Sequence, residues 1–201
     1  MNFIEHLKLV GGVKPCPHIE MATRGVGYTG LGPCPSCHGT GHVLDLAPLL
    51  AKPLFLESCT YDLISKFKKV AQINEIEEQE RGTKFVIVGP QRAHSLVYEV
   101  ARQLGGTAVV VIEEDADQQS VDWNKPRDKD YRLSLPIPPD ATVLFVTDRM
   151  DSGRLEEFKS MVDLAEGGRA INILPYILCL VSTEFENKTI YKIISLHQEK
   201  S

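Results

Sequence analysis

The chain has 201 residues, of which 43% are hydrophobic, so it is long enough for one well-buried α/β domain with a small appendage, or for two small domains. Its formal net charge of −5 argues against a nucleic-acid partner, because such a surface needs excess Lys and Arg to neutralise phosphates, although a local pocket can still bind a small anion. With no signal-peptide pattern at the start and no run approaching the ~20 apolar residues that span a bilayer, we expect a cytoplasmic protein without a membrane partner.

The first fifty residues divide into a short helix and a stretch of unusual composition. Apolar residues recur at helical spacing from Phe3 to Val10, and the pattern stops at Gly11-Gly12. Residues 15–41 are then rich in Gly, Pro, Cys and His and show no periodicity. A hydrophobic core cannot order such a segment, so something else must do so.

Cysteine and histidine spacing in that stretch predicts a structural zinc site. The number of cysteines is odd and no secretory signal precedes them, which favours metal binding or burial over disulfides. Four candidate ligands stand in two knuckles: Cys16, His18, Cys34 and Cys37. Thiolate and imidazole donors at this spacing suit tetrahedral zinc. His38 and His42 are close enough to replace His18, and a redox Cys-x-x-Cys pair or a disordered loop are the alternative interpretations.

Beyond residue 50 the pattern alternates between helix and strand. A long helix is predicted after Lys52-Pro53 through Glu78, and shorter helices over residues 95–104 and 154–165. Buried strands are predicted over residues 85–88, 108–112 and 143–146, and further strands in 131–135, 169–181 (with a second short piece around Pro175) and 190–196. This alternation predicts a doubly wound α/β fold with a mostly parallel sheet and helices on both faces. We expect an N-terminal segment, 1–50, packed on an α/β domain, 51–201. Cys59 and Cys179, in apolar surroundings, are predicted core residues.

The candidate ligand-binding residues lie at the end of the third predicted core strand. Asp148 follows Val143–Val146 at the carboxyl end of the strand, where open α/β sheets bind ligands. Asp151, Ser152 and Gly153 then form a turn whose N–H groups can cradle a phosphate before the next helix. An ordinary strand-turn-helix connection, capped by Asp151 or Ser152, is the alternative interpretation.

These residues resemble the type I phosphoribosyltransferases, and among them the orotate phosphoribosyltransferases. The family motif has a strand, two acids, two variable positions and Thr-Thr-Gly, and Val146-Thr-Asp-Arg-Met-Asp-Ser-Gly153 keeps this spacing with only the second acid. Four other segments resemble the opening helix, the segment after the orotate-site hairpin, the pyrophosphate loop and its following helix: residues 3–12, 42–53, 85–90 and 97–105. The cysteine-rich stretch stands in place of the hairpin, and residues 34–41 are also similar to half of a zinc-binding repeat of Hsp40-type chaperones.

The resemblance implies transfer of 5-phosphoribosyl from its diphosphate donor to a nucleobase, orotate or similar, in nucleotide synthesis or salvage such as pyrimidine biosynthesis. It implies magnesium with the donor, and it leads us to expect a homodimer. Asp148 would be the catalytic residue that holds the ribose hydroxyls, and the donor would contact Thr147, Asp148, Asp151, Ser152, Gly153, Gln91 and Arg92. Gln91 and Arg92 would meet the pyrophosphate, although Arg92 could equally be a surface residue at a helix start. The zinc segment would rebuild one wall of the base pocket.

Several residues depart from the family pattern. Thr147 replaces the first acid, Leu155 stands where a hydroxyl is usual, and Glu113-Glu114 replace basic residues near the pyrophosphate, where a carboxylate is repulsive. Lys125, Arg127 and Lys129 could compensate, or could belong to a solvated loop. These departures favour a second hypothesis, a non-catalytic descendant that binds a phosphoribosyl compound or nucleotide as a regulator or partner-binding module. A purely interaction role for the zinc segment is a third.

Overall fold

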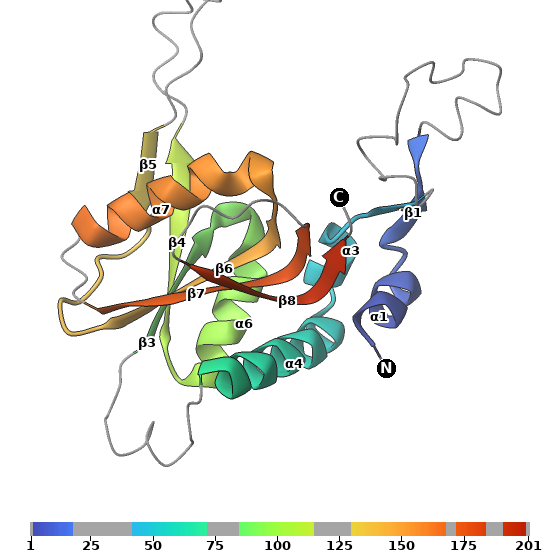
Figure 1. Ribbon diagram of the computed structural model, residues 1–201, viewed down its shortest axis with the longest axis horizontal. Helices are drawn as coiled ribbons and strands as arrows, with labels where there is room; N and C mark the ends of the chain where they lie inside the picture. Colours follow the sequence, from blue (N-terminus) through green and yellow to red (C-terminus); the bar gives the residue numbers. More distant parts are fainter. Residues whose placement is uncertain are drawn as a thin grey trace, which may run out of the picture.

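The fold is seen in a computed structural model, which describes residues 2–17, 42–71, 85–114, 130–167, 172–183 and 191–199. A six-stranded sheet forms the centre, and a two-stranded sheet lies near the N-terminal helix (Figure 1). None of the helices in these ranges is long and apolar enough to cross a membrane.

The central sheet confirms the predicted mostly parallel arrangement. Its strands are β3 (Phe85–Pro90), β4 (Thr107–Glu114), β5 (Asp130–Leu133), β6 (Thr142–Met150), β7 (Asn172–Thr183) and β8 (Lys192–Glu199). They lie in the order β5-β4-β3-β6-β7-β8, and only β5 pairs antiparallel. The chain moves from β3 outward to β4 and β5, then returns past β3 to β6. The strand order therefore reverses between β3 and β6, and ligands of doubly wound folds bind at such a reversal.

Helices cover both faces of the sheet, as expected. On one face α4 (Pro53–Ala71) and α6 (His94–Leu104) pack on the sheet, and α7 (Leu155–Gly167) covers the other (Figure 1). Side chains of a strand alternate between faces. Ile87 of β3 therefore packs with α4 and α6, while its neighbour Val88 packs with α7. Burial on both faces explains why these strands are apolar without interruption.

The N-terminal segment joins the same hydrophobic core. The α1 helix (Phe3–Leu9) begins with a capping box in which Asn2 and Glu5 bond each other's backbone N–H. A hairpin of β1 (Val13–Pro15) and β2 (His42–Leu44) follows, then the short α3 (Ala47–Leu50). Leu7 and Leu49 are fully buried in the cluster that contains the α4 and α6 side chains. Residues on both sides of the predicted boundary at residue 50 thus share one core.

The apolar run around Pro175 forms one continuous strand, β7, where we predicted a strand followed by a second short piece. Its pairing with β6 is irregular at this point: Ile173 lies opposite Val143, and Ile177 lies opposite Phe145. Proline has no N–H to donate to the ladder, so it is tolerated where the register shifts. The bulge lets the strand continue through the proline.

Candidate functional site

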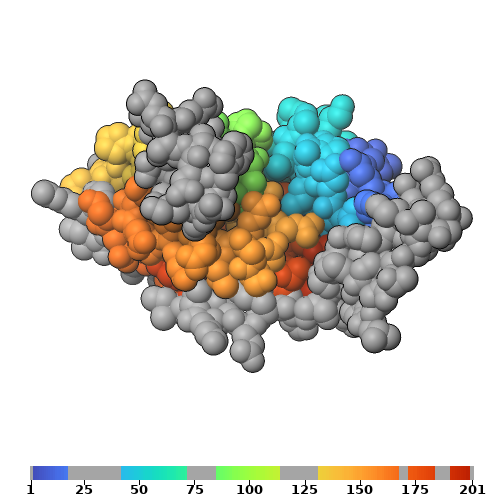
Figure 2. Space-filling view, turned by 90° about the horizontal axis from the view of Figure 1, so that it is seen from above, coloured from blue at the N-terminus to red at the C-terminus, as the bar shows by residue number. Residues whose placement is uncertain are grey.

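A cleft of about 670 Å³ opens at the carboxyl ends of β3 and β4, beside the turn that follows β6. Its lining is Gln91, Arg92, Val111, Glu113, Tyr131, Gly153, Arg154, Glu156 and Glu157. Seen from above, the orange surface of α7 lies along the front, and the cyan surface of the residues that begin with β2 lies behind it and to the right (Figure 2). The cleft therefore lies at the reversal of strand order, and it contains three of the predicted ligand-binding residues, Gln91, Arg92 and Gly153.

The strand that carries Asp148 is longer than predicted. β6 continues to Met150, so Asp148 lies two residues before the end of the strand and not after it. Thr147 is buried, and its hydroxyl oxygen lies 3.2 Å from Asp148 Oδ1. The Asp148 side chain is 14% exposed. Asp148 is thus a carboxylate held in a defined orientation at the edge of the sheet.

Arg92 is neither a free surface cation nor an open anion site. It lies in the 3₁₀ turn η1 (Gln91–Ala93), which follows β3 directly. Its Nε donates to Asp148 Oδ1 at 3.1 Å, and one terminal nitrogen donates to Thr147 Oγ1 at 3.2 Å. The other terminal nitrogen donates to Glu157 Oε1. The Arg92 guanidinium therefore joins the ends of β3 and β6 to the first turn of α7.

The turn after β6 has the backbone that the phosphate interpretation needs. Asp151 is extended, and Ser152–Arg154 form the 3₁₀ turn η2, which leads straight into α7. The Asp151 carboxylate makes no capping hydrogen bond to this turn, which leaves Ser152 as the cap that the alternative interpretation needs. The first N–H groups of a helix have no intrahelical acceptor. Ser152 and Gly153, both exposed, hence present N–H groups at the positive end of α7, where an anion is stabilised.

Glu157 is a member of the site that the sequence did not reveal. It lies 65 residues from Arg92 in the chain, and its second oxygen, Oε2, lies 3.7 Å from Arg154. Asp148, Arg92, Glu157 and Arg154 form a row of alternating charges, of which the last three line the cleft. The signal of Glu157 in the sequence is its place in the acidic first turn of a helix. Acidic residues are common there because they interact favourably with the helix dipole, so this signal does not indicate a site.

Arg149, next to Asp148, connects the site to the N-terminal hairpin. One terminal nitrogen donates to Glu199 of β8 at 2.9 Å, and the other donates to the Leu44 carbonyl of β2 at 3.0 Å. The Arg149 and Glu199 side chains are 23% and 20% exposed, so water screens this ion pair only in part. At the same end of the hairpin, an ion pair between Lys14 of β1 and Asp45, directly after β2, lowers the pKa of Asp45. These contacts fix the hairpin against the carboxyl edge of the sheet.

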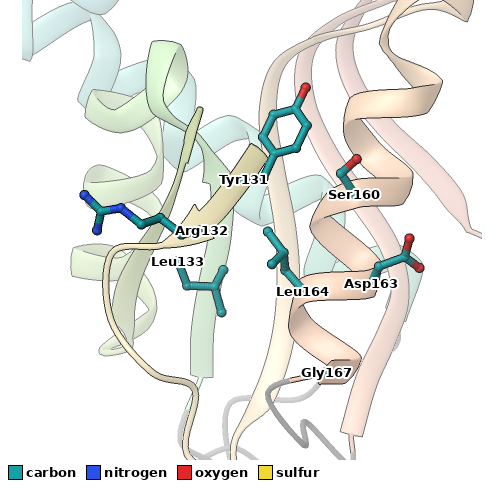
Figure 3. A pocket seen from close by; sticks show the side chains of 7 residues that line it. All are labelled: Tyr131, Arg132, Leu133, Ser160, Asp163, Leu164 and Gly167. Atoms are coloured by element: carbon teal, nitrogen blue, oxygen red, sulfur yellow. The ribbon is translucent and has the colours of Figure 1, made fainter. Parts of the chain in front are cut away.

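A second hollow of about 570 Å³ lies between β5 and α7. Tyr131 and Leu133 lie on its strand side and Ser160, Asp163 and Leu164 on its helix side, while the Arg132 side chain extends away from the helix (Figure 3). Tyr131 lines both hollows. The predicted ligand-binding residues all lie outside this second hollow.

The predicted metal ligands fall mostly outside the described ranges. Cys16 is fully buried directly after β1, whereas His18, Cys34 and Cys37 are not among the described residues. The same holds for Lys125, Arg127 and Lys129 of the basic loop. Within the described ranges, no three His, Cys, Asp or Glu side chains come together as a metal site.

The two cysteines predicted to be core residues are confirmed as such. Cys59 is 1% exposed and Cys179 is fully buried. Burial raises the pKa of the Cys59 thiol to about 12 and raises the pKa of Cys179 as well. Both thiols therefore stay protonated and unreactive at neutral pH.

Comparison with solved structures identifies the fold as that of the phosphoribosyltransferases. Adenine phosphoribosyltransferase from Thermoanaerobacter pseudethanolicus superposes with a TM-score of 0.53 at 17% identity, covering 97% of this chain and 99% of that one. Orotate phosphoribosyltransferase from Aeropyrum pernix gives 0.51 at 13%, covering 98% and 93%. UMP synthase from Leishmania donovani gives 0.58 at 11%, and the match covers 98% of this chain but 35% of that longer protein.

Comparison of the sequence gives no match of either kind that was sought. The sequence matches no protein-family model and none of the curated proteins. The adenine-specific and orotate-specific enzymes resemble the chain to a similar degree, with TM-scores of 0.53 and 0.51. The likeness therefore supports the predicted fold class without distinguishing a base.

Proposed function

We propose that this protein is a phosphoribosyltransferase that transfers 5-phosphoribosyl from phosphoribosyl diphosphate to a nucleobase. The observation that carries the proposal is the placement of Asp148 and the turn Asp151–Gly153 together, at the reversal of strand order in a phosphoribosyltransferase-like fold. This edge offers one carboxylate for sugar hydroxyls and one helix N-terminus for a phosphate.

The proposed roles follow from the charge that develops as pyrophosphate leaves. Asp148 would accept hydrogen bonds from the ribose hydroxyls, and its negative charge would favour the oxocarbenium-like sugar. Ser152 and Gly153 would donate N–H groups to the 5-phosphate, with Asp151 shaping the turn and Thr147 orienting Asp148 through its hydroxyl. Holding both ends of the sugar fixes the reacting carbon for attack by the base. Magnesium would accompany the diphosphate, and orotate is one base to be tested among several.

Replacing Asp148 by Asn tests the ribose role. The amide keeps the shape and an acceptor oxygen for Arg92 but loses the charge, so donor affinity should fall by about tenfold or more, as for hydrogen bonds to charged groups. Calorimetry with phosphoribosyl diphosphate and magnesium measures the change. Asp163→Asn is the matched control, because Asp163 lies on α7 in the second hollow, away from the cleft.

Turnover is tested by pyrophosphate release with a panel of bases that includes orotate and adenine. Release with one base, lost in Asp148→Asn and kept in Asp163→Asn, supports the transferase. Donor binding without release by folded, metal-loaded protein would contradict catalysis and support the second function below.

The second candidate is a protein that binds a phosphoribosyl compound or nucleotide without turnover. The specific observation in its favour is the Arg92 guanidinium, which is already paired with Asp148 and Glu157. Such a protein would act as a regulator or partner-binding module, and a homodimer is proposed for either function.

We also propose that Cys16, His18, Cys34 and Cys37 bind one structural zinc beside the site, with His38 or His42 as alternatives to His18. Buried Cys16, just after β1, would hold the segment at the hairpin that Arg149 fixes. Metal analysis of purified protein should find about one zinc per chain, from the four-ligand geometry of such sites. Cys34→Ser should remove it, whereas Cys179→Ala, which changes a core thiol, should not. Equal zinc content in the two variants would contradict the assignment.

A further inference from the structure

Glu157 already occupies part of the anion-binding surface of Arg92. The Arg92 guanidinium has three acceptors, two of which are carboxylates, and its side chain is 30% exposed. A guanidinium has five N–H donors, and each of the three nitrogens of Arg92 already donates to one acceptor, so fewer N–H groups are left for a second anion. An incoming diphosphate at Arg92 would therefore have to displace Glu157.

The charges around Arg92 make that displacement unfavourable. The cleft lining holds two arginines, Arg92 and Arg154, and three glutamates, Glu113, Glu156 and Glu157. Asp148 adds a further carboxylate on the same row of charges. A polyanion beside Glu157 would meet repulsion in a site that is partly shielded from water. By contrast, Ser152 and Gly153 are exposed at the start of α7, and Asp151 is the carboxylate next to them in the chain.

We propose that Glu157 is a specificity-determining residue, which blocks the diphosphate position at Arg92 and makes the site prefer ligands with a 5-phosphate alone. The inference rests on the proposed function for the location of the 5-phosphate. The preferred chemical class is then a ribose 5-phosphate or a nucleoside 5′-monophosphate. A diphosphate donor binds only when the Glu157 carboxylate moves away from Arg92.

Calorimetry on the full chain uses two probes, inorganic pyrophosphate with magnesium and ribose 5-phosphate. The first probe tests the block by Glu157, and the second tests the 5-phosphate position at the turn. Glu157→Gln should strengthen pyrophosphate binding by about tenfold or more, because one like charge within ion-pair distance is removed. Binding of ribose 5-phosphate should change less than about twofold, because Glu157 pairs with the side chains of Arg92 and Arg154, whereas the proposed 5-phosphate donors are the backbone N–H groups of Ser152 and Gly153.

Glu156→Gln is the matched control. Glu156 precedes Glu157, lines the same cleft and carries the same charge, but it pairs with Lys159 and its side chain is 84% exposed. Glu157→Asp is a second variant that keeps the charge and the fold while withdrawing the carboxylate by one methylene. It should give a smaller gain for pyrophosphate, and thermal unfolding checks that all three variants are folded.

The outcomes distinguish the inference from the function on which it rests. Equal pyrophosphate affinity in Glu157→Gln and Glu156→Gln, or no pyrophosphate binding by either variant, overturns the role of Glu157. This holds whatever the affinity for ribose 5-phosphate is. Failure of the wild-type protein to bind ribose 5-phosphate overturns the 5-phosphate position that the proposed function supplies, and with it the ligand preference, even if Glu157→Gln gains pyrophosphate. A gain for pyrophosphate confined to the Glu157 variants, with ribose 5-phosphate binding unchanged, supports both.

Discussion

Replacing Gly89 by Ala should lower the free energy of unfolding by about 3 kcal/mol or more. This loss is at or above the upper end of the range that is typical when an extra group is inserted into a packed core. A Cβ on Gly89 would lie 2.3 Å from the Val146 carbonyl oxygen and 2.5 Å from a methyl group of Val97. The first contact is with backbone, so no side-chain rotation can relieve it. Strand β3 would have to move away from β6, and urea denaturation measures the loss.

Gly89 also fixes the geometry of the site, because it lies three residues before Arg92. Separation of the strands would pull the Arg92 guanidinium away from Asp148 and Thr147, so Gly89→Ala should lower ligand affinity as well as stability. Gly167→Ala is the control, since a Cβ there has no atom within 4 Å and the backbone angle is ordinary. Equal stability of the two variants would show that β3 and β6 are not in close contact at Gly89.

Truncating Phe145 to Ala should cost about 3–5 kcal/mol, as large-to-small changes of buried aromatic residues do. Phe145 of β6 is fully buried, and its ring meets Phe158 of α7 edge-on, with centroids 5.3 Å apart. It meets Tyr191, just before β8, in the same way at 6.0 Å. Loss of the ring leaves a cavity where three elements meet, and it removes the aromatic pairing energy too.

Thermal and urea unfolding of Phe145→Ala should be compared with Tyr98→Ala, a change at an aromatic residue of α6 that is 57% exposed. The exposed substitution should change stability by no more than about 0.5 kcal/mol. Phe145→Leu should fall between the two, because it keeps most of the buried apolar volume. A loss in Phe145→Ala no larger than in Tyr98→Ala would contradict the packing of α7 on this face.

The sequence predicts the framework well because the framework depends on local pattern. Val143–Val146 is apolar throughout since both faces of β6 are covered, and this pattern identifies the strand directly. The α6 helix ends at Gly105, whose left-handed φ of 65° favours glycine, so its end was predictable as well. Strand-helix alternation and the turn at Asp151–Gly153 then indicate where we propose that a ligand binds.

The part that the sequence could not supply depends on contacts between distant segments. Nothing near Glu157 indicates that its partner is Arg92, and nothing near Arg92 separates a ligand-binding guanidinium from one held by two carboxylates. The strand around Pro175 was misjudged for a similar reason, because the tolerance of a proline depends on the register with β6. The zinc prediction rests on ligand spacing alone, and three of its four residues lie outside the described ranges.

Asp148 and Arg149 are adjacent in β6 but contact different parts of the protein. Asp148 faces Arg92, while Arg149 binds the Leu44 carbonyl and Glu199. Neighbouring side chains of a strand point to opposite faces, so a single peptide unit joins the proposed sugar site to the support of the hairpin. Loss of the Arg149 contacts would therefore release residues 42–44 and also disturb the backbone that orients Asp148.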